Sequence, residues 1–176
     1  KNCWKLVFNY RGFFVNQSGT YQVSNCICKD NSTGFFSRKQ TSITLTNSLF
    51  VDNSTGFKQY YLGNASLIVN CTFDNTSTDL HWNPYNATQE DLNIYNSIFQ
   101  NQIVGHGENP VNLYYCDYVD GNLGYNVNIV EGNITDDPLF VDAINGVVNS
   151  AVGYANGSLG TNLVVNTIGV TANVSL

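Results

Sequence analysis

Two sets of apolar residues recur along the chain at a nearly constant interval, with polar residues between them. Each set is defined by its distance from a Cys or Ser that recurs with it. Three residues before that Cys or Ser lie Val23, Leu45, Ile68, Ile94 and Leu113. Two residues after it lie Cys28, Phe50, Phe73, Phe99 and Tyr118. Alternation within each segment is typical of β-strands, and stacked strands of this kind share one continuous core.

A hexapeptide that occurs twice supports the same period. The sequence Asp-Asn-Ser-Thr-Gly-Phe fills residues 30–35 and returns at residues 52–57. In the same register lie Asn2-Cys3, Asn25-Cys26, Asn47-Ser48, Asn70-Cys71, Asn96-Ser97 and Tyr115-Cys116. A period of about 22.6 residues, taken from these positions, is typical of repeat proteins. It predicts an all-β parallel β-helix of about seven to eight coils. Residues 1–150 would form the coils, and residues 151–176 terminal strands for capping or pairing between subunits.

The asparagine that precedes each Cys or Ser is expected to form a structural ladder. A buried polar side chain is costly unless it is hydrogen-bonded, and a stack supplies partners from the coils above and below. Asparagine also tolerates the left-handed backbone conformation. The predicted rungs, turned inward and roughly 4.8 Å apart, are Asn25, Asn47, Asn70 and Asn96.

The chain has five cysteines, an odd number, so at least one thiol stays unpaired within a single chain. Four of them occupy the column that requires a small side chain, namely Cys3, Cys26, Cys71 and Cys116. We interpret these four as core-filling residues. Cys3 and Cys26 lie in adjacent coils, so bonded and free states both stay open. The Ser97 coil separates Cys71 from Cys116, so these two are not expected to bond.

Uncharged polar residues dominate the composition, since only 11% of the chain is charged. Ten Asn-x-Ser/Thr sites occur, against about four expected by chance. This excess predicts N-glycosylation and a secreted, extracellular or cell-surface location. Asn70 is expected to stay unmodified because the ladder would bury it. The predicted acceptors are Asn16, Asn31, Asn53, Asn64, Asn75, Asn86, Asn133, Asn156 and Asn173.

Three of these acceptors should line one exposed edge of the stack. Asn31, Asn53 and Asn75 recur at equal intervals on the turn that follows the aromatic column. No apolar run approaches the roughly 18 residues that span a membrane.

Residues 115–142 resemble a known family. Residues 115–121 read Tyr-Cys-Asp-Tyr-Val-Asp-Gly, residues 132–134 Gly-Asn-Ile, and residues 136–142 Asp-Asp-Pro-Leu-Phe-Val-Asp. With the preceding coils, these motifs are similar to the C-terminal coils of right-handed parallel β-helix repeat proteins. The resemblance covers about residues 20 to 150 and implies the pectin-lyase-like superfold, found in secreted surface proteins, adhesins and polysaccharide-active enzymes. The chain departs from the family pattern at residues 149–152, so its terminal coil is expected to be built differently.

Catalysis has to be sought at individual residues, because this superfold hosts many functions. Residues 105–107, Gly-His-Gly, are similar to a polygalacturonase motif, but the Arg-x-Lys and Asn-Thr-Asp partners of that motif are missing. Asp30 and Asp52 would lie about 5 Å apart, like a retaining glycosidase pair, although turn chemistry explains them more simply. Residues 81–85 would form a loop whose aromatic residues bind sugar or pack on the helix side. A calcium site at Asp136, Asp137 or Asp142 stays open, but the spacing of these residues matches no known loop motif. The sequence predicts no catalytic residue, metal or cofactor.

Charge is divided along the chain. All seven Lys and Arg lie between Lys1 and Lys58, where the formal charge is +5, whereas residues 59–176 carry −11. In a solenoid, sequence position becomes position along the axis, so one end should be basic and the other acidic. Residues 161–165 and 169–176 read as uncharged strands, and open strand edges invite pairing.

These features predict an extracellular structural glycoprotein that stacks head to tail into a filament. Its partners would be further copies of itself and N-linked glycans, without nucleic acid. Two alternatives stay open. One is an adhesin or surface module cut from a larger β-helix protein. The other is a carbohydrate-active enzyme, either a polysaccharide lyase or a glycoside hydrolase.

Overall fold

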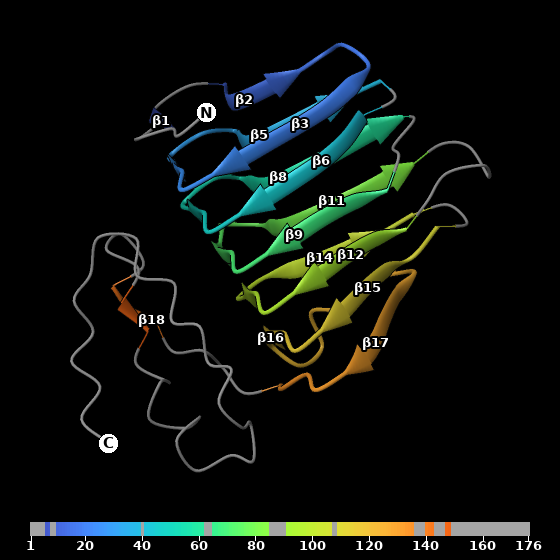
Figure 1. Ribbon diagram of the computed structural model, residues 1–176. Coiled ribbons are helices and arrows are strands. Elements are labelled where there is room, and N and C mark those ends of the chain that lie inside the picture. The colour runs from blue at the N-terminus through green and yellow to red at the C-terminus, as the bar shows by residue number, and fades with distance from the viewer. Residues whose placement is uncertain are drawn as a thin grey trace.

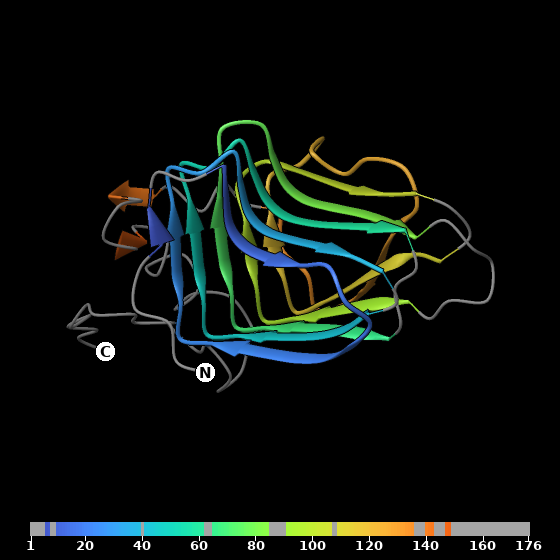
Figure 2. The ribbon, with the colours of Figure 1, turned by 90° about the horizontal axis from the view of Figure 1, so that it is seen from above.

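The computed structural model describes residues 6–7, 10–39, 41–61, 65–84, 91–106, 109–135, 140–142 and 147–148. Within these ranges every regular element is a β-strand, and most of the strands wind into a stack of coils (Figure 1). This arrangement confirms the predicted parallel β-solenoid. Seen from above, two long sheets face each other and a sheet of short strands joins them at one end (Figure 2).

Three parallel sheets form the sides of the stack. Sheet 1, with the short strands, has the order β1 (Leu6–Val7), β4 (Ile27–Lys29), β7 (Leu49–Val51), β10 (Thr72–Asp74), β13 (Ile98–Phe99) and β16 (Asp117–Tyr118). Sheet 2 has the order β14 (Gln102–Gly105), β11 (Thr78–Pro84), β8 (Thr55–Tyr61), β5 (Thr33–Arg38) and β2 (Arg11–Val15). Sheet 3 has the order β17 (Val127–Glu131), β15 (Val111–Tyr114), β12 (Leu92–Tyr95), β9 (Ser66–Val69), β6 (Thr41–Thr46) and β3 (Gly19–Ser24). A complete coil therefore contributes one strand to each sheet in turn.

The stack has about four turns, so the prediction of seven to eight coils is wrong. That number assumed that the repeat continues to residue 176. Among the described residues, β17 is the last strand of the parallel stack, and the next strands, β18 (Phe140–Asp142) and β19 (Val147–Val148), pair antiparallel in a separate sheet. Residues 151–176, where the sequence predicts terminal strands, lie outside the described residues.

Strand register confirms both apolar columns. In sheet 3 the paired residues are Val23, Leu45, Ile68, Ile94 and Leu113. In sheet 1 they are Cys28, Phe50, Phe73, Phe99 and Tyr118. The ring of Phe73 stacks at 4.9 Å from the rings of both Phe50 and Phe99. Sheet 2 supplies a third inward column that the sequence analysis missed, made of Phe13, Phe35, Phe57, Leu80 and Ile103.

The corner between sheets 3 and 1 is built on the predicted asparagines. Asn25, Asn47, Asn70 and Asn96 all have positive φ, between 49° and 55°. Each backbone N–H donates to a carbonyl of the next coil at 3.1 to 3.2 Å, so the four residues stack as expected. Their side chains are not turned into the core, however, because Asn25 is exposed and the other three are partly buried.

The residue after each of these asparagines fills the interior of the corner. Cys26 and Ser48 are buried, and the Cys26 N–H donates to Ser48 Oγ at 3.2 Å. Asn70 is partly buried and its Nδ2 donates to Asn47 Oδ1 at 3.3 Å, so the expectation that it carries no glycan stays a prediction.

Candidate functional site

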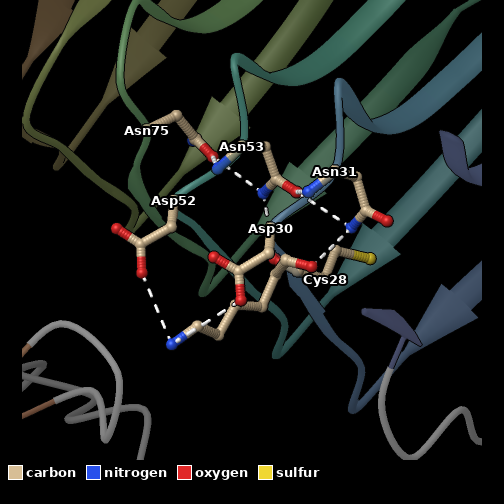
Figure 3. A network of polar contacts seen from close by, with 7 residues as sticks. Cys28, Asp30, Asn31, Asp52, Asn53 and Asn75 are labelled. Carbon is tan, nitrogen blue, oxygen red and sulfur yellow. Dashed lines mark hydrogen bonds and ion pairs between the residues drawn. The ribbon is translucent and has the colours of Figure 1, made fainter. Parts of the chain in front are cut away.

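A buried asparagine ladder lines the corner between sheets 1 and 2 (Figure 3). Asn31, Asn53 and Asn75 are at most 4% exposed. The backbone N–H and the Nδ2 of Asn31 both donate to Asn53 Oδ1 at 3.0 Å. Asn53 repeats this pattern toward Asn75 Oδ1, at 3.2 and 2.8 Å, and its Nδ2 also donates to the carbonyl of Cys28 at 2.9 Å. The ladder thus gives each buried amide the partners that burial requires.

Glycines make room for this ladder. A Cβ on Gly56 would lie 2.5 Å from Asn75 Nδ2 and 2.9 Å from the ring of Phe73. A Cβ on Gly34 would lie 2.7 Å from the ring of Phe50. Contacts this short would push the ladder and the aromatic column apart. The repeated hexapeptide is therefore a structural unit, in which Asn supplies the rung, Gly the space beside it and Phe the core residue.

The ladder ends on a buried carboxylate, Asp79. In the register of β8 and β11, Asp79 stands opposite Gly56. Its Oδ1 accepts hydrogen bonds from Asn75 N and Nδ2, both at 2.9 Å, as an asparagine rung would. Its Oδ2 accepts a bond from the backbone N–H of Asn101 at 2.6 Å. Burial raises the pKa of Asp79 to about 7, although these hydrogen bonds lower it.

Asp79 is not among the residues predicted from the sequence, although one signal marked its coil. The step from Cys71 to Ser97 is the longest in the repeat. The extra length accompanies a register shift between Thr78 and Leu80, which leaves Asp79 outside the regular pairing with β14. A bulge of this kind re-aims a side chain, here into the corner of the coil.

The structure changes the interpretation of the predicted glycan acceptors. The expected exposed row of Asn31, Asn53 and Asn75 is wrong, because these side chains form the buried ladder. Asn133 is partly buried; its Oδ1 accepts a bond from Cys116 N and its Nδ2 donates to the carbonyl of Leu113. Asn16 is exposed. The remaining predicted acceptors lie outside the described residues and are Asn64, Asn86, Asn156 and Asn173.

Cysteines fill the core as the sequence predicts. Cys26, Cys71 and Cys116 are fully buried, and Cys71 and Cys116 are free thiols. Cys3, the cysteine considered as a disulfide partner of Cys26, lies outside the described residues. Burial raises the pKa of Cys71 and that of Cys116 to about 12. Thiols that remain protonated at neutral pH are poor nucleophiles and poor metal ligands.

We therefore expect iodoacetamide at pH 8 to leave Cys71 and Cys116 unmodified in the folded protein. Both should react fully once urea unfolds the chain, since the thiolate is the reactive form and unfolding restores it. Peptide mass spectrometry after timed alkylation measures this directly, with the urea-treated sample as the control. Alkylation of Cys71 faster than global unfolding would contradict the buried position.

The carboxylates considered as a glycosidase pair form a structural ion pair with a lysine. Lys29 Nζ lies 3.5 Å from Asp52 Oδ2 and 3.9 Å from Asp30 Oδ2. Both aspartates have a φ of 56°, typical of the left-handed residue at a tight turn. A structural role in the turn is favoured over a glycosidase pair. The shared lysine neutralises both carboxylates, which stabilises the corner.

The segment with the histidine and tryptophan is a strand, so its prediction as a loop is wrong. His81 and Trp82 lie in β11, and Trp82 is fully buried. The imidazole rings of His81 and His106 are 5.0 Å apart. Burial, with help from Lys58 and His106, lowers the pKa of His81 to about 4. Gly107 of the polygalacturonase-like tripeptide lies outside the described residues.

The possible calcium ligands are not tested. Asp136 and Asp137 lie outside the described residues, and the side chain of Asp142 is not described. No group of three or more metal-binding side chains occurs among the residues that are described. The same part of the chain contains no helix long and apolar enough to cross a membrane.

Comparison of the chain with models of protein families, with curated proteins and with solved structures gives no significant match. The geometry of the solenoid itself is therefore the basis for a functional assignment.

Proposed function

We propose that this protein is an extracellular structural glycoprotein whose copies stack head to tail into a filament. The observation that carries the proposal is Ile129 in the last strand of sheet 3. Ile129 pairs with Leu113 and so continues the interior column, yet it is 57% exposed whereas Leu113 is fully buried. An interior residue left open at the end of a stack is covered when another coil adds to it.

Other exposed apolar residues lie near the two ends of the stack. Among the residues described, the large apolar side chains with high exposure are Tyr10, Phe14, Tyr115, Tyr125, Ile129 and Val130. Tyr10 and Phe14 belong to the first turn, where Phe14 lies on the outer side of sheet 2 against Phe36, and the others follow β15 or lie in β17. Removing such surfaces from water favours association by about 25 cal/mol for each Å² buried.

The distribution of charge also favours head-to-tail stacking. All Lys and Arg residues precede residue 59, and the acids after this point whose side chains are described are Asp74, Asp79, Asp91, Asp117, Asp120 and Glu131. Within one molecule the two ends lie farther apart than the Debye length of about 8 Å. Stacking brings the basic end of one copy against the acidic end of the next, a heterologous contact that builds a filament when it does not close.

Location and family are part of the same proposal. The excess of glycosylation sites supports export, and Asn16 offers an exposed acceptor. The motifs in residues 115–142 support right-handed coiling of the pectin-lyase-like kind.

Sedimentation velocity tests the association. We expect the wild-type protein to form larger species as its concentration rises, and to assemble more slowly at high salt because screening weakens the attraction between ends. Ile129→Asp should remain monomeric, because it places a charge in the apolar contact. Thr44→Asp is the matched control in the middle of sheet 3, and it should assemble like the wild type. Association of Ile129→Asp equal to that of the wild type would refute the end contact.

A further inference from the structure

The outer face of sheet 2 is cationic. Along one row of paired residues it presents Phe14, Phe36, Lys58 and His81, which alternate with the inward column of the same strands. Arg11 and Arg38 lie beside this row in β2 and β5. Within the five strands of sheet 2 the only acidic residue is Asp79, whose carboxylate is buried in the asparagine ladder. The face is therefore positive although the chain carries a net charge of −6.

Two arginines converge on one aromatic ring of this face. The guanidinium carbon of Arg11 lies 4.4 Å from the ring centroids of both Phe14 and Phe36. The guanidinium carbon of Arg38 lies 5.2 Å from the Phe36 centroid. Cation–π contacts of this kind hold a guanidinium group in place while its N–H donors stay available to a ligand.

These arginines lack carboxylate partners in the described part of the chain. The ion pairs there join Lys29 to Asp30 and Asp52, at the corner between sheets 1 and 2. Arg38 and the adjacent Lys39 are exposed, and Lys58 lies 5.4 Å from the ring of Tyr60. The cations come from three neighbouring strands, spaced about 4.8 Å apart along the stack, and are staggered along the strand direction, since Arg11 pairs with Thr33, Lys58 with Phe36 and Arg38 with Tyr60. They spread positive charge diagonally across the face, which suits an extended polyanion.

We propose that the outer face of sheet 2 binds a linear sulfated polysaccharide. Guanidinium groups hold oxyanions through paired N–H donors. A carboxylate has two oxygens and is filled by one guanidinium group, whereas a sulfate ester has three terminal oxygens and can be shared by Arg11 and Arg38. The binding face lies on the side of the stack, so it stays open when copies associate through their ends.

The same geometry disfavours single-stranded nucleic acid as the ligand. Proteins that bind such strands stack the bases on open aromatic faces. Here cations already lie against two of the rings, since Arg11 and Arg38 lie against Phe36 and Lys58 lies against Tyr60. Charge remains available for recognition, whereas the rings of Phe36 and Tyr60 do not, and the Phe14 ring, 46% exposed, shares a face with Arg11.

Titration calorimetry of the full chain provides the test, with three probes matched in total charge. These are a heparin oligosaccharide, a polyuronate oligosaccharide without sulfate, and single-stranded DNA. We expect the heparin probe to bind most tightly, with an affinity that falls as salt rises. The double variant Arg11→Gln with Arg38→Gln should bind at least about tenfold more weakly, because two charge-assisted contacts are lost.

Two further variants separate guanidinium geometry from charge. Arg38→Lys keeps the charge and loses the paired donors, so it should also weaken heparin binding. Lys29→Gln removes an equal charge outside this face and should bind like the wild type. Circular dichroism of each variant checks that the fold is retained. The proposal is overturned if heparin does not bind, if the double variant binds like the wild type, or if polyuronate or DNA binds as tightly as heparin.

Discussion

Replacing Asn53 with alanine should lower the free energy of unfolding by about 4 kcal/mol, since several buried polar groups each lose a hydrogen bond at once. Asn53 is fully buried in the middle of the ladder. Its loss removes Asn53 Oδ1, which accepts from the backbone N–H and Nδ2 of Asn31. It also removes Asn53 Nδ2, which donates to Asn75 Oδ1 and to the Cys28 carbonyl. Urea unfolding followed by circular dichroism measures the change.

Asn16→Ala is the control, because it removes an exposed asparagine from a sequon of the same kind. Its free energy of unfolding should stay within about 0.5 kcal/mol of the wild type. Asn53→Asp should be destabilising as well, since it brings a carboxylate oxygen to the Cys28 carbonyl. If Asn53→Ala were as stable as the wild type, the buried ladder would be refuted.

Asp79 should make the solenoid less stable as the pH rises from 4 to 7. Burial raises the pKa of Asp79 from 3.8 to about 7 in the folded state. A group whose pKa is raised by folding adds stability below its unfolded pKa, and this stability is lost as the pH rises through the folded pKa. The shift corresponds to about 4 kcal/mol, at 1.36 kcal/mol for each pKa unit.

Comparison with Asp79→Asn isolates this effect. His81 acts in the opposite direction, because its lowered folded pKa makes stability rise with pH between about 4 and 6.5. The difference in unfolding free energy between the wild type and Asp79→Asn cancels the contribution of His81. This difference should shift against the wild type as pH increases from 4 to 7, measured by urea unfolding at each pH. A difference that is independent of pH would contradict a buried, titrating Asp79.

The apolar columns could be predicted because their residues repeat in both type and spacing. Leu45, Ile68 and Ile94 keep one register through coils of different length, since a slip of one residue would turn each of them out of the core. Gly34 and Gly56 also repeat at the same period. Their role could not be predicted, because it depends on contacts with the ladder and the aromatic column that the sequence does not reveal.

The two asparagine rows show where the sequence was insufficient. Asn53 and Asn47 are both repeated polar residues at corners, and a repeat period alone does not tell which of them faces inward. The sequon around Asn53 favoured the surface, whereas the buried ladder uses the same amide for hydrogen bonding. Asp79 could not be placed either, because one carboxylate in a bulge has no repeated counterpart.

The segment around Trp82 was predicted to be a loop and is a strand, and the reason again lies in contacts between coils. The irregular length of its coil suggested a loop, but pairing with β8 extends β11 through Trp82 to Pro84. Strand pairing with the neighbouring coil thus decided the structure where the local sequence did not.

Fibre diffraction from the assembled protein, supported by electron microscopy, tests the central claim most directly. If copies stack end to end, the strands lie perpendicular to the filament and the solenoid axis follows it. We therefore predict a meridional reflection at about 4.8 Å, the spacing between neighbouring strands. A protein that stays monomeric at all concentrations and salt conditions, or a filament in which the strand spacing runs across the axis, would contradict head-to-tail assembly.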